Sequence, residues 1–142
     1  MGLLDIIKNL VGGTPTENLA ENENGNPILF EKCLTALLES EKQKFITISG
    51  DRDTVVQVAK NGDLLQLNIA TYPVSDNPDN KLAVLGIMLP EGSTLGDWEA
   101  DVYAMYNIPT SATSELATTI DSIFKKLYNN TDAYTISVTL EN

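Results

Sequence analysis

The clearest pattern along the chain is an alternation of apolar and polar residues on both sides of Asn61-Gly62. Asn-Gly is favoured in two-residue type I′ turns because both residues tolerate positive φ angles. The expected register places Val58 opposite Leu65 and Val56 opposite Leu67 on one face, with Gln57 opposite Gln66 on the other. The pattern therefore predicts a β-hairpin with one buried face and one wet face.

Apolar residues at spacings of three and four predict two long helices. The first follows Asn26, a good N-cap residue, has Pro27 at its first position and runs to about Glu41. The second begins near Ser111 and extends through Leu127, with one apolar face. Two lysines near its end suit the C-terminal side of the helix dipole.

Further segments have the composition of strands. Residues 45–49 are rich in β-branched and aromatic side chains, and residues 134–140 alternate apolar residues with Thr and Ser. The nearly continuous apolar run 82–89 predicts a central strand, preceded by a loop over residues 72–81. Residues 97–106 fit both a helix and a strand, and their tyrosines and valine favour a strand.

Together these elements predict an α+β fold, an antiparallel sheet of about five to six strands with two main helices packed on one face. A short amphipathic helix over residues 1–11 comes first. Residues 12–26 contain almost no large apolar side chain and are interpreted as a flexible linker. Residues 27–142 then form a single α+β domain, long enough to bury a self-sufficient core.

The predicted N-terminal helix carries Leu3, Leu4, Ile7 and Leu10 on one face. A helix of about ten residues is unstable alone in water, so this face must pack against something. Docking on its own domain or on a second copy in a homodimer is favoured, because a tethered segment has a high effective concentration. A separate protein partner is another option, and a membrane surface is the weakest, because Lys8 is the only basic side chain of this helix. We expect these four residues to make the contact.

Charge excludes several classes of partner. The chain has 20 acidic and nine basic residues, which give a net charge of −11. Nucleic acid binding depends on clusters of lysine and arginine, and the longest basic run here is Lys125-Lys126. We therefore expect no nucleic acid partner and no attraction to anionic membrane surfaces. No apolar stretch approaches the length of a membrane span.

The chain has no histidine, the commonest general base and metal ligand. Histidine-based catalytic triads and ordinary zinc sites are therefore excluded. The segment 76–80 lacks the ligand spacing and the glycine of a calcium loop and is typical of a polar turn. Asp97, Glu99 and Asp101 place two carboxylates on one side, as a strand or as a helix, and are interpreted as solvated surface. We expect no catalytic residue, no metal and no cofactor.

The single cysteine, Cys33, lies on the apolar stripe of the first long helix. We interpret it as a small buried hydrophobic residue, because a reactive thiol needs cationic neighbours. It cannot form an internal disulfide, and the first residues lack the basic region and cleavage site of a signal peptide. We therefore expect a cytoplasmic protein.

The order of elements, in particular the segments 45–69, 82–90 and 116–127, resembles the small bacterial proteins of the type III secretion chaperone and YbjN-like group. The resemblance implies an α+β sandwich, commonly dimeric, that binds an extended peptide segment and catalyses nothing. The N-terminal helix and the final strand depart from that group. No binding residue can be carried over.

Three hypotheses of function follow. The first is a non-enzymatic protein-binding module, chaperone-like or adaptor/regulatory, in a bacterial-type cytoplasm. The second is an acidic immunity or inhibitor protein that blocks a basic toxin by charge complementarity. The third is an uncharacterised enzyme that uses carboxylates together with Tyr72, Tyr103 or Tyr106.

Overall fold

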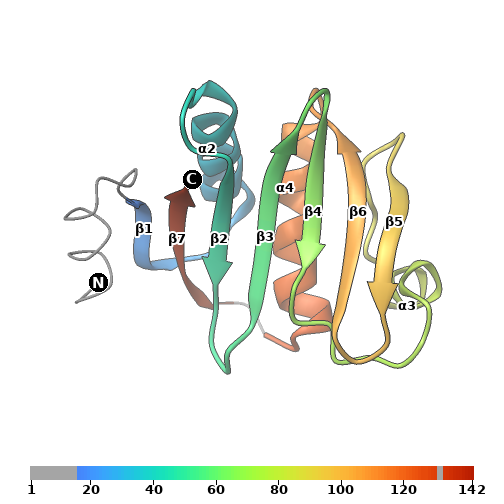
Figure 1. Cartoon of the computed structure of the whole chain (residues 1–142). Helices are drawn as coiled ribbons and strands as arrows, with labels where there is room; N and C mark the ends of the chain where they lie inside the picture. Colours follow the sequence, from blue (N-terminus) through green and yellow to red (C-terminus); the bar gives the residue numbers. More distant parts are fainter. Residues whose placement is uncertain (1–15, 131–132) are drawn as a thin grey trace.

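A seven-stranded antiparallel sheet is the main element of residues 16–130 and 133–142, the residues that the computed structural model describes (Figure 1). The strands are β1 Glu17–Asn24, β2 Phe45–Ser49, β3 Val55–Asn61, β4 Leu64–Ile69, β5 Thr94–Glu99, β6 Tyr103–Pro109 and β7 Thr135–Glu141. They lie in the order β1-β7-β2-β3-β4-β6-β5. The helices are α2 Pro27–Glu39, α3 Pro78–Leu85 and α4 Thr113–Ser122, which continues as a π-helical turn, η1 Ile123–Leu127.

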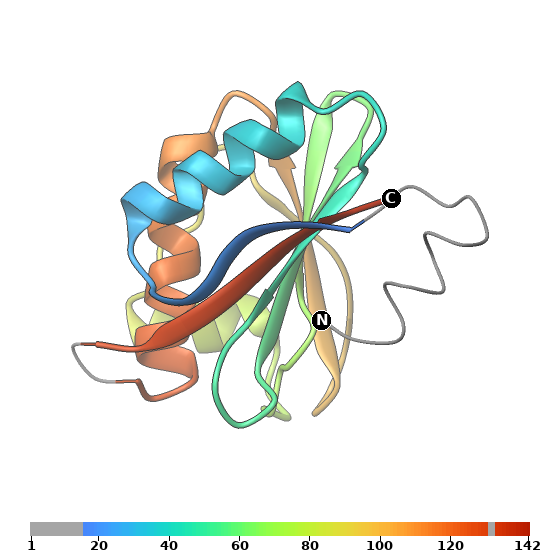
Figure 2. The ribbon, with the colours of Figure 1, turned by 90° about the vertical axis from the view of Figure 1, so that its left-hand side faces the viewer.

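The core lies between one face of this sheet and helices α2 and α4, which pack against each other (Figure 2). Alternate residues of β2, β3 and β4 supply the buried face, as the sequence pattern predicted for the β3–β4 hairpin. Phe124 of η1 lies at the centre of an aromatic cluster. Its ring centroid is 6.2 Å from that of Phe30, 5.2 Å from that of Tyr128 and 5.3 Å from that of Tyr134. The predicted fold class is therefore confirmed, with a larger sheet than expected.

Both long helices form where the sequence placed them. The side-chain oxygen of Asn26 accepts a hydrogen bond from the Leu29 amide at 2.9 Å and caps α2, with Pro27 at its first position. The second helix, α4 with η1, ends at Leu127 as predicted. Lys126, expected to interact with the helix dipole, instead donates to the Gly86 carbonyl at 3.1 Å, which ties η1 to the end of α3.

The predicted hairpin forms as β3 and β4, but its register differs from the expected one. Val58 pairs with Leu67 rather than Leu65, and the two turn residues are Gly62 and Asp63. Gly62 has a φ of 61°, whereas Asp63 has a negative φ, the pattern of a type II′ turn. A shift by two residues leaves every side chain on its predicted face, so the alternation alone could not distinguish the two registers.

The predicted central strand over residues 82–89 is wrong, because most of this run lies in helix α3 and the turn after it. Asn77 caps α3 by accepting from the Asp79 amide, and Gly86 ends it with a left-handed φ of 73°. Val84 is 79% exposed, so the apolar run is not buried on all sides. Part of the predicted loop 72–81 belongs to this helix as well.

The prediction of a flexible linker over residues 12–26 is wrong for residues 17–24. These residues form strand β1, which pairs with the outer edge of β7. Of its eight residues only Ala20 is buried. The strand is held chiefly by backbone hydrogen bonds, to which the Gly25 amide adds one to the Tyr134 carbonyl at 2.9 Å. Backbone pairing leaves no hydrophobic pattern in a sequence, which is why this strand was missed. The predicted N-terminal helix, 1–11, lies outside the described residues.

Residues 97–106, for which both a helix and a strand were considered, lie in a β-hairpin. The strand interpretation is therefore correct in kind, but β5 ends at Glu99 and β6 begins at Tyr103. Asp101 lies in the intervening turn with a φ of 63°. Glu99 and Asp101 are consequently not two positions on one side of a continuous strand.

The register of the β3–β4 hairpin gives a direct test. Gly62→Ala is expected to destabilise the protein by about 1–2 kcal/mol, because alanine disfavours the positive φ of this position. No other atom lies within 4 Å of an added Cβ, so the backbone conformation is the cause. Asn61→Ala is the matched control and is expected to cost much less, because Asn61 has no positive φ. Urea unfolding of both variants measures the difference, and equal losses would support the predicted type I′ turn instead.

Candidate functional site

The sheet face opposite the helices is the candidate functional site. No described helix covers it, and it faces the viewer in Figure 1 and the right-hand side in Figure 2. Paired residues of neighbouring antiparallel strands project to the same face, so the side chains form rows across the strands. From β7 to β5 the middle row consists of Thr139, Thr47, Gln57, Asn68, Met105 and Asp97.

A hollow of about 350 Å³ lies on this face across β2, β3, β4, β6 and β5. It is lined by Phe45, Gln57, Ala59, Gln66, Asn68, Asp97, Tyr103 and Met105. Apolar surface dominates this lining, and side-chain amides supply most of the polar groups. We call this surface the open-face hollow. Its volume is at the lower end of the range of known small-molecule binding sites.

The open-face hollow differs sharply from the rest of the chain in charge. The chain carries a net charge of −11, yet β2, β3, β4 and β6 present no ionisable carboxylate, lysine or arginine to the two rows that contain the hollow. Acidic side chains occur only at the two ends of these rows, Glu141 on β7 and Asp97 on β5. Depletion of charge at the centre of a surface is typical of protein–protein interfaces.

Hydrogen bonds organise most of the polar groups of this face. Gln57 Nε2 donates to Thr47 Oγ1 at 3.2 Å, and the Thr47 hydroxyl in turn donates to Glu141 Oε2 at 2.8 Å. The Tyr103 hydroxyl donates to the carboxylate of Asp97. Asn68 is different, because its buried Oδ1 has no hydrogen-bond partner among the described residues. An acceptor in this situation is costly, so it invites a donor from a molecule that fills the hollow.

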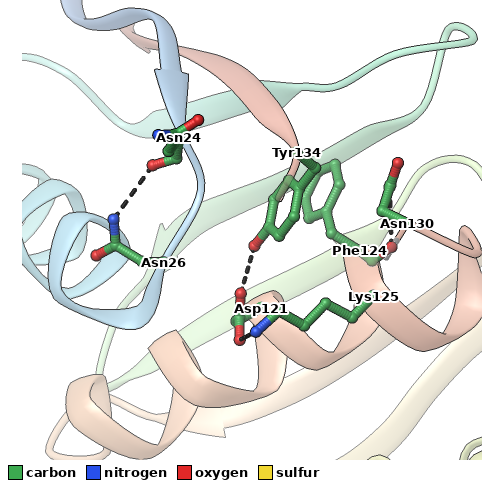
Figure 3. Close-up of polar contacts among 7 residues, drawn as sticks. All are labelled: Asn24, Asn26, Asp121, Phe124, Lys125, Asn130 and Tyr134. Atoms are coloured by element: carbon green, nitrogen blue, oxygen red, sulfur yellow. Dashed lines mark hydrogen bonds and ion pairs between the residues drawn. The ribbon is translucent and has the colours of Figure 1, made fainter. Parts of the chain in front are cut away.

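A second polar cluster joins β7 to α4 on the core side of the sheet (Figure 3). The Tyr134 hydroxyl donates to Asp121 Oδ1 at 2.5 Å, and Lys125 Nζ lies 3.1 Å from Asp121 Oδ2. The Tyr134 ring stacks on Phe124 with an interplanar angle of 6°. Both oxygens of this buried carboxylate therefore have partners, and the arrangement is that of a structural tie rather than of a reacting group.

The tyrosines considered for catalysis lie in two separate environments. Tyr103 lines the open-face hollow, whereas Tyr72 and Tyr106 are buried in the core. Burial, followed by a hydrogen bond to Asp79, raises the pKa of Tyr106 well above its usual range. The hydrogen bond to Asp97 is the main cause that raises the pKa of Tyr103. These hydroxyls stay protonated at neutral pH and are poorly suited to accept a proton.

The structure also places the other residues that the sequence singled out. Leu3, Leu4, Ile7 and Leu10, the predicted partner-binding residues, lie outside the described part of the chain. Asp97 borders the hollow, while Asp101 accepts a hydrogen bond from Ser75 in the turn beyond it. The sequence contained one signal for this face. The outward positions of the predicted hairpin carry no charged residue, and their polar side chains include the amides Gln57, Gln66 and Asn68.

Cys33 is buried, as predicted, with 2% of its surface exposed. Burial is the main cause that raises the pKa of its thiol to about 11, and Glu23 adds to the effect. Within residues 16–130 and 133–142 no group of three or more acidic or cysteine side chains is arranged to hold a metal ion. No described helix has the length and apolar character to span a membrane.

Comparisons with protein-family models, with curated proteins and with solved structures found no significant match.

The unpaired amide oxygen of Asn68 predicts that its removal does not lower the stability of the protein. Asn68→Val is expected to maintain or raise the free energy of unfolding, by up to about 1 kcal/mol, because it removes a buried acceptor without a partner. The matched control is Gln57→Val in the neighbouring strand, which loses the hydrogen bond to Thr47. Urea unfolding compares the two. A larger loss in the Asn68 variant than in the control would contradict the prediction.

The hydrogen bond between Tyr134 and Asp121 predicts that removal of the Tyr134 hydroxyl lowers the free energy of unfolding. Tyr134→Phe is expected to destabilise the protein by about 1–3 kcal/mol, because it leaves Oδ1 of the buried Asp121 carboxylate without its hydroxyl donor. Tyr103→Phe removes an exposed hydroxyl that also binds a carboxylate and should leave stability nearly unchanged. In a double-mutant cycle with Asp121→Asn the two losses should be less than additive. Additive losses in thermal unfolding would show that the pair does not act together.

Proposed function

We propose that this protein is a non-enzymatic protein-binding module, chaperone-like or adaptor in kind, that takes an apolar segment of a partner on its open-face hollow. One observation carries the proposal: a mostly apolar hollow, with Asp97 at one edge as the one acidic residue of its lining, lies at the centre of a sheet face in a strongly acidic chain. Such a face is costly to leave in water and is suited to burial against another protein surface.

The lining indicates the chemistry of the partner. Phe45, Met105 and the ring of Tyr103 present adaptable apolar surface, and methionine and aromatic residues are enriched in protein interfaces. Gln66 and Asn68 add amide groups, of which the Asn68 oxygen lacks a donor. A partner segment with several apolar side chains and one hydrogen-bond donor fits this surface best.

The polar groups around the hollow support binding rather than catalysis. The carboxylate of Asp97 is already engaged by the Tyr103 hydroxyl. The hydroxyls of Tyr72 and Tyr106 donate to the Asp76 carbonyl and to Asp79, away from the hollow. An enzyme of the carboxylate and tyrosine type needs at least one such group free to exchange a proton with a substrate.

An acidic inhibitor of a basic toxin is a second candidate. Glu141 and Asp97 flank the hollow at the two ends of its rows and would attract a partner with basic residues around an apolar centre. The two candidates differ in their response to salt. Binding of an apolar segment changes little with ionic strength, whereas charge-driven binding weakens steeply.

Met105→Asp tests the proposal, because it places a charge at the floor of the hollow. A partner retained from the host lysate by the immobilised wild-type protein should bind this variant at least about tenfold more weakly, as expected for an interface hot spot. Met88→Asp is the matched control, since Met88 is 82% exposed at a distance from this face. Titration with the purified partner, at low and high salt, measures both effects.

Equal binding by the wild-type protein and both variants would refute the assignment of the hollow. Loss of binding in high salt, with a small effect of Met105→Asp, would favour the acidic inhibitor. The thermal unfolding midpoint of each variant is the check that the substitution has not disrupted strand β6.

A further inference from the structure

Asn24 and Asn61 are the two asparagines of the chain that precede a glycine. We propose that Asn61, at the tip of the β3–β4 hairpin, is a site of spontaneous deamidation, whereas the fold protects Asn24 from the same reaction. The side-chain amide of Asn61 becomes a carboxylate without the action of an enzyme. This inference is independent of the proposed function, because it concerns the chemistry of the hairpin tip and not the occupant of the hollow.

The reaction is a ring closure between a side chain and the next peptide group. The backbone nitrogen of Gly62 loses its proton to the solvent and attacks the side-chain carbonyl carbon of Asn61. A bond forms between these two atoms, and the bond from that carbon to the side-chain nitrogen breaks. The leaving nitrogen takes up a proton and departs as ammonia, so that a five-membered succinimide remains. Glycine favours this step because it has no side chain to hinder the approach and permits backbone angles that other residues rarely adopt.

Water then opens the succinimide at either of its two carbonyl carbons. Attack at the side-chain carbonyl breaks its bond to the Gly62 nitrogen and leaves an ordinary aspartyl residue. Attack at the backbone carbonyl breaks the original peptide bond, and the chain then continues through the side-chain carboxyl as an isoaspartyl residue. Both products carry a new negative charge, and the second also has one additional carbon in its backbone.

The structure leaves the reacting atoms at Asn61 accessible. Asn61 and Gly62 are both exposed, and Gly62 has a φ of 61°. Within the described part of the chain no group accepts a hydrogen bond from the Gly62 amide, and no atom beyond its chain neighbours lies within 4 Å of a Cβ placed there. Ring closure requires rotation about the Cα–C bond of Asn61, which the last pair of the hairpin, Asn61 with Leu64, opposes. Such a terminal pair opens without unfolding of the core.

The same dipeptide is held firmly at the end of β1. The Gly25 amide donates to the Tyr134 carbonyl at 2.9 Å, so its nitrogen loses its proton less readily. The Tyr134 ring covers Gly25 so closely that a Cβ there would overlap the ring. Rotation of this peptide would also disturb Asn26, whose side chain donates to the Asn24 carbonyl at 3.2 Å (Figure 3) and caps α2. Deamidation of Asn24 therefore requires a larger part of the fold to open.

Modification of Asn61 acts on the hairpin that supplies part of the open-face hollow. Asn61 lies on the same face of β3 as Gln57 and Ala59, which line the hollow, because alternate residues of a strand share a face. The isoaspartyl product lengthens the backbone beside the turn, so the pair of Asn61 with Leu64 loses its alignment. The hairpin is consequently less stable in protein that carries this product.

The test compares the two asparagines in one sample of the full-length protein. The protein is incubated at mildly alkaline pH, either folded in buffer or unfolded in guanidinium chloride. After increasing times it is digested with an acid protease at low pH, at which deamidation is slow. Mass spectrometry then measures the fraction of each peptide that has exchanged its amide for a carboxylate. In guanidinium chloride Asn24 and Asn61 should react at similar rates, whereas in the folded protein Asn61 should react several-fold faster.

Asn61→Gln is the matched control, because its longer side chain keeps the amide but closes only a six-membered ring, which forms much more slowly. This variant should show no conversion at position 61, while Asn24 should react as it does in the wild type. Equal rates at Asn24 and Asn61 in the folded protein would overturn the inference, and so would a faster reaction at Asn24. Protection of both asparagines under conditions that convert the unfolded chain would also overturn it.

The effect on the hairpin is measured with the same samples. Anion exchange separates the modified protein by its added charge, and chromatography of its peptides identifies the isoaspartyl product. The isoaspartyl fraction should unfold at a lower concentration of guanidinium chloride than unmodified protein. Asn61→Asp, which adds the charge without the additional carbon, should cause a smaller shift. Equal unfolding midpoints for all three proteins would contradict the expected loss of alignment between Asn61 and Leu64.

Discussion

One-sided burial of the sheet is the constraint on which the rest of this structure depends. Alternate residues of each central strand point toward α2 and α4 and are buried. The ring of Phe124 contacts Phe30 of α2 and Tyr134, which directly precedes β7, and so connects both helices with this strand. Because the period of a strand is two residues, burying one face commits every intervening residue to the other. The composition of that second face is therefore independent of the core, and here it is partly apolar, with its carboxylates Glu141 and Asp97 on β7 and β5 and none on the four strands between them in the rows of the hollow.

The edges of the sheet are stabilised by different means from its centre. β1 contributes one buried side chain, Ala20, and is held by backbone pairing with β7. Its exposed glutamates and asparagines also give the sheet a charged, polar border, which opposes pairing with strands of other molecules. On the core side, Tyr134 and Asp121 fix β7 to α4 (Figure 3). The sheet can thus extend beyond the area that the two helices cover.

The open-face hollow follows from the same arrangement. Uncharged amides and apolar side chains from separate strands meet because antiparallel pairing aligns them in rows, and no described helix lies over them. Asn68 is the position at which local stability and surface chemistry conflict, since a buried acceptor without a partner has a cost. Such conflicts tend to occur at functional sites, which is why this face is the candidate site.

The sequence by itself determined the fold class, the two long helices and the faces of the central hairpin, because caps and hydrophobic periodicity are local signals. Asn26 and Pro27 marked the start of α2, and alternation assigned Val58 and Leu67 to the core. The register remained open, since a shift of two residues preserves every face. Helix α3 was missed although its cap, Asn77, and its terminal glycine were both visible, because a continuous apolar run suggested a strand.

Only the tertiary structure decided which strands are neighbours, and with this the existence of the site. Strand β1 is specified by backbone hydrogen bonds to a segment more than a hundred residues away, and such bonds depend on no particular side chain. The open-face hollow brings Phe45, Gln57, Gln66 and Met105 together from four strands. Strand pairing across such sequence distances depends on how the whole core packs, so it cannot be read from any local sequence pattern.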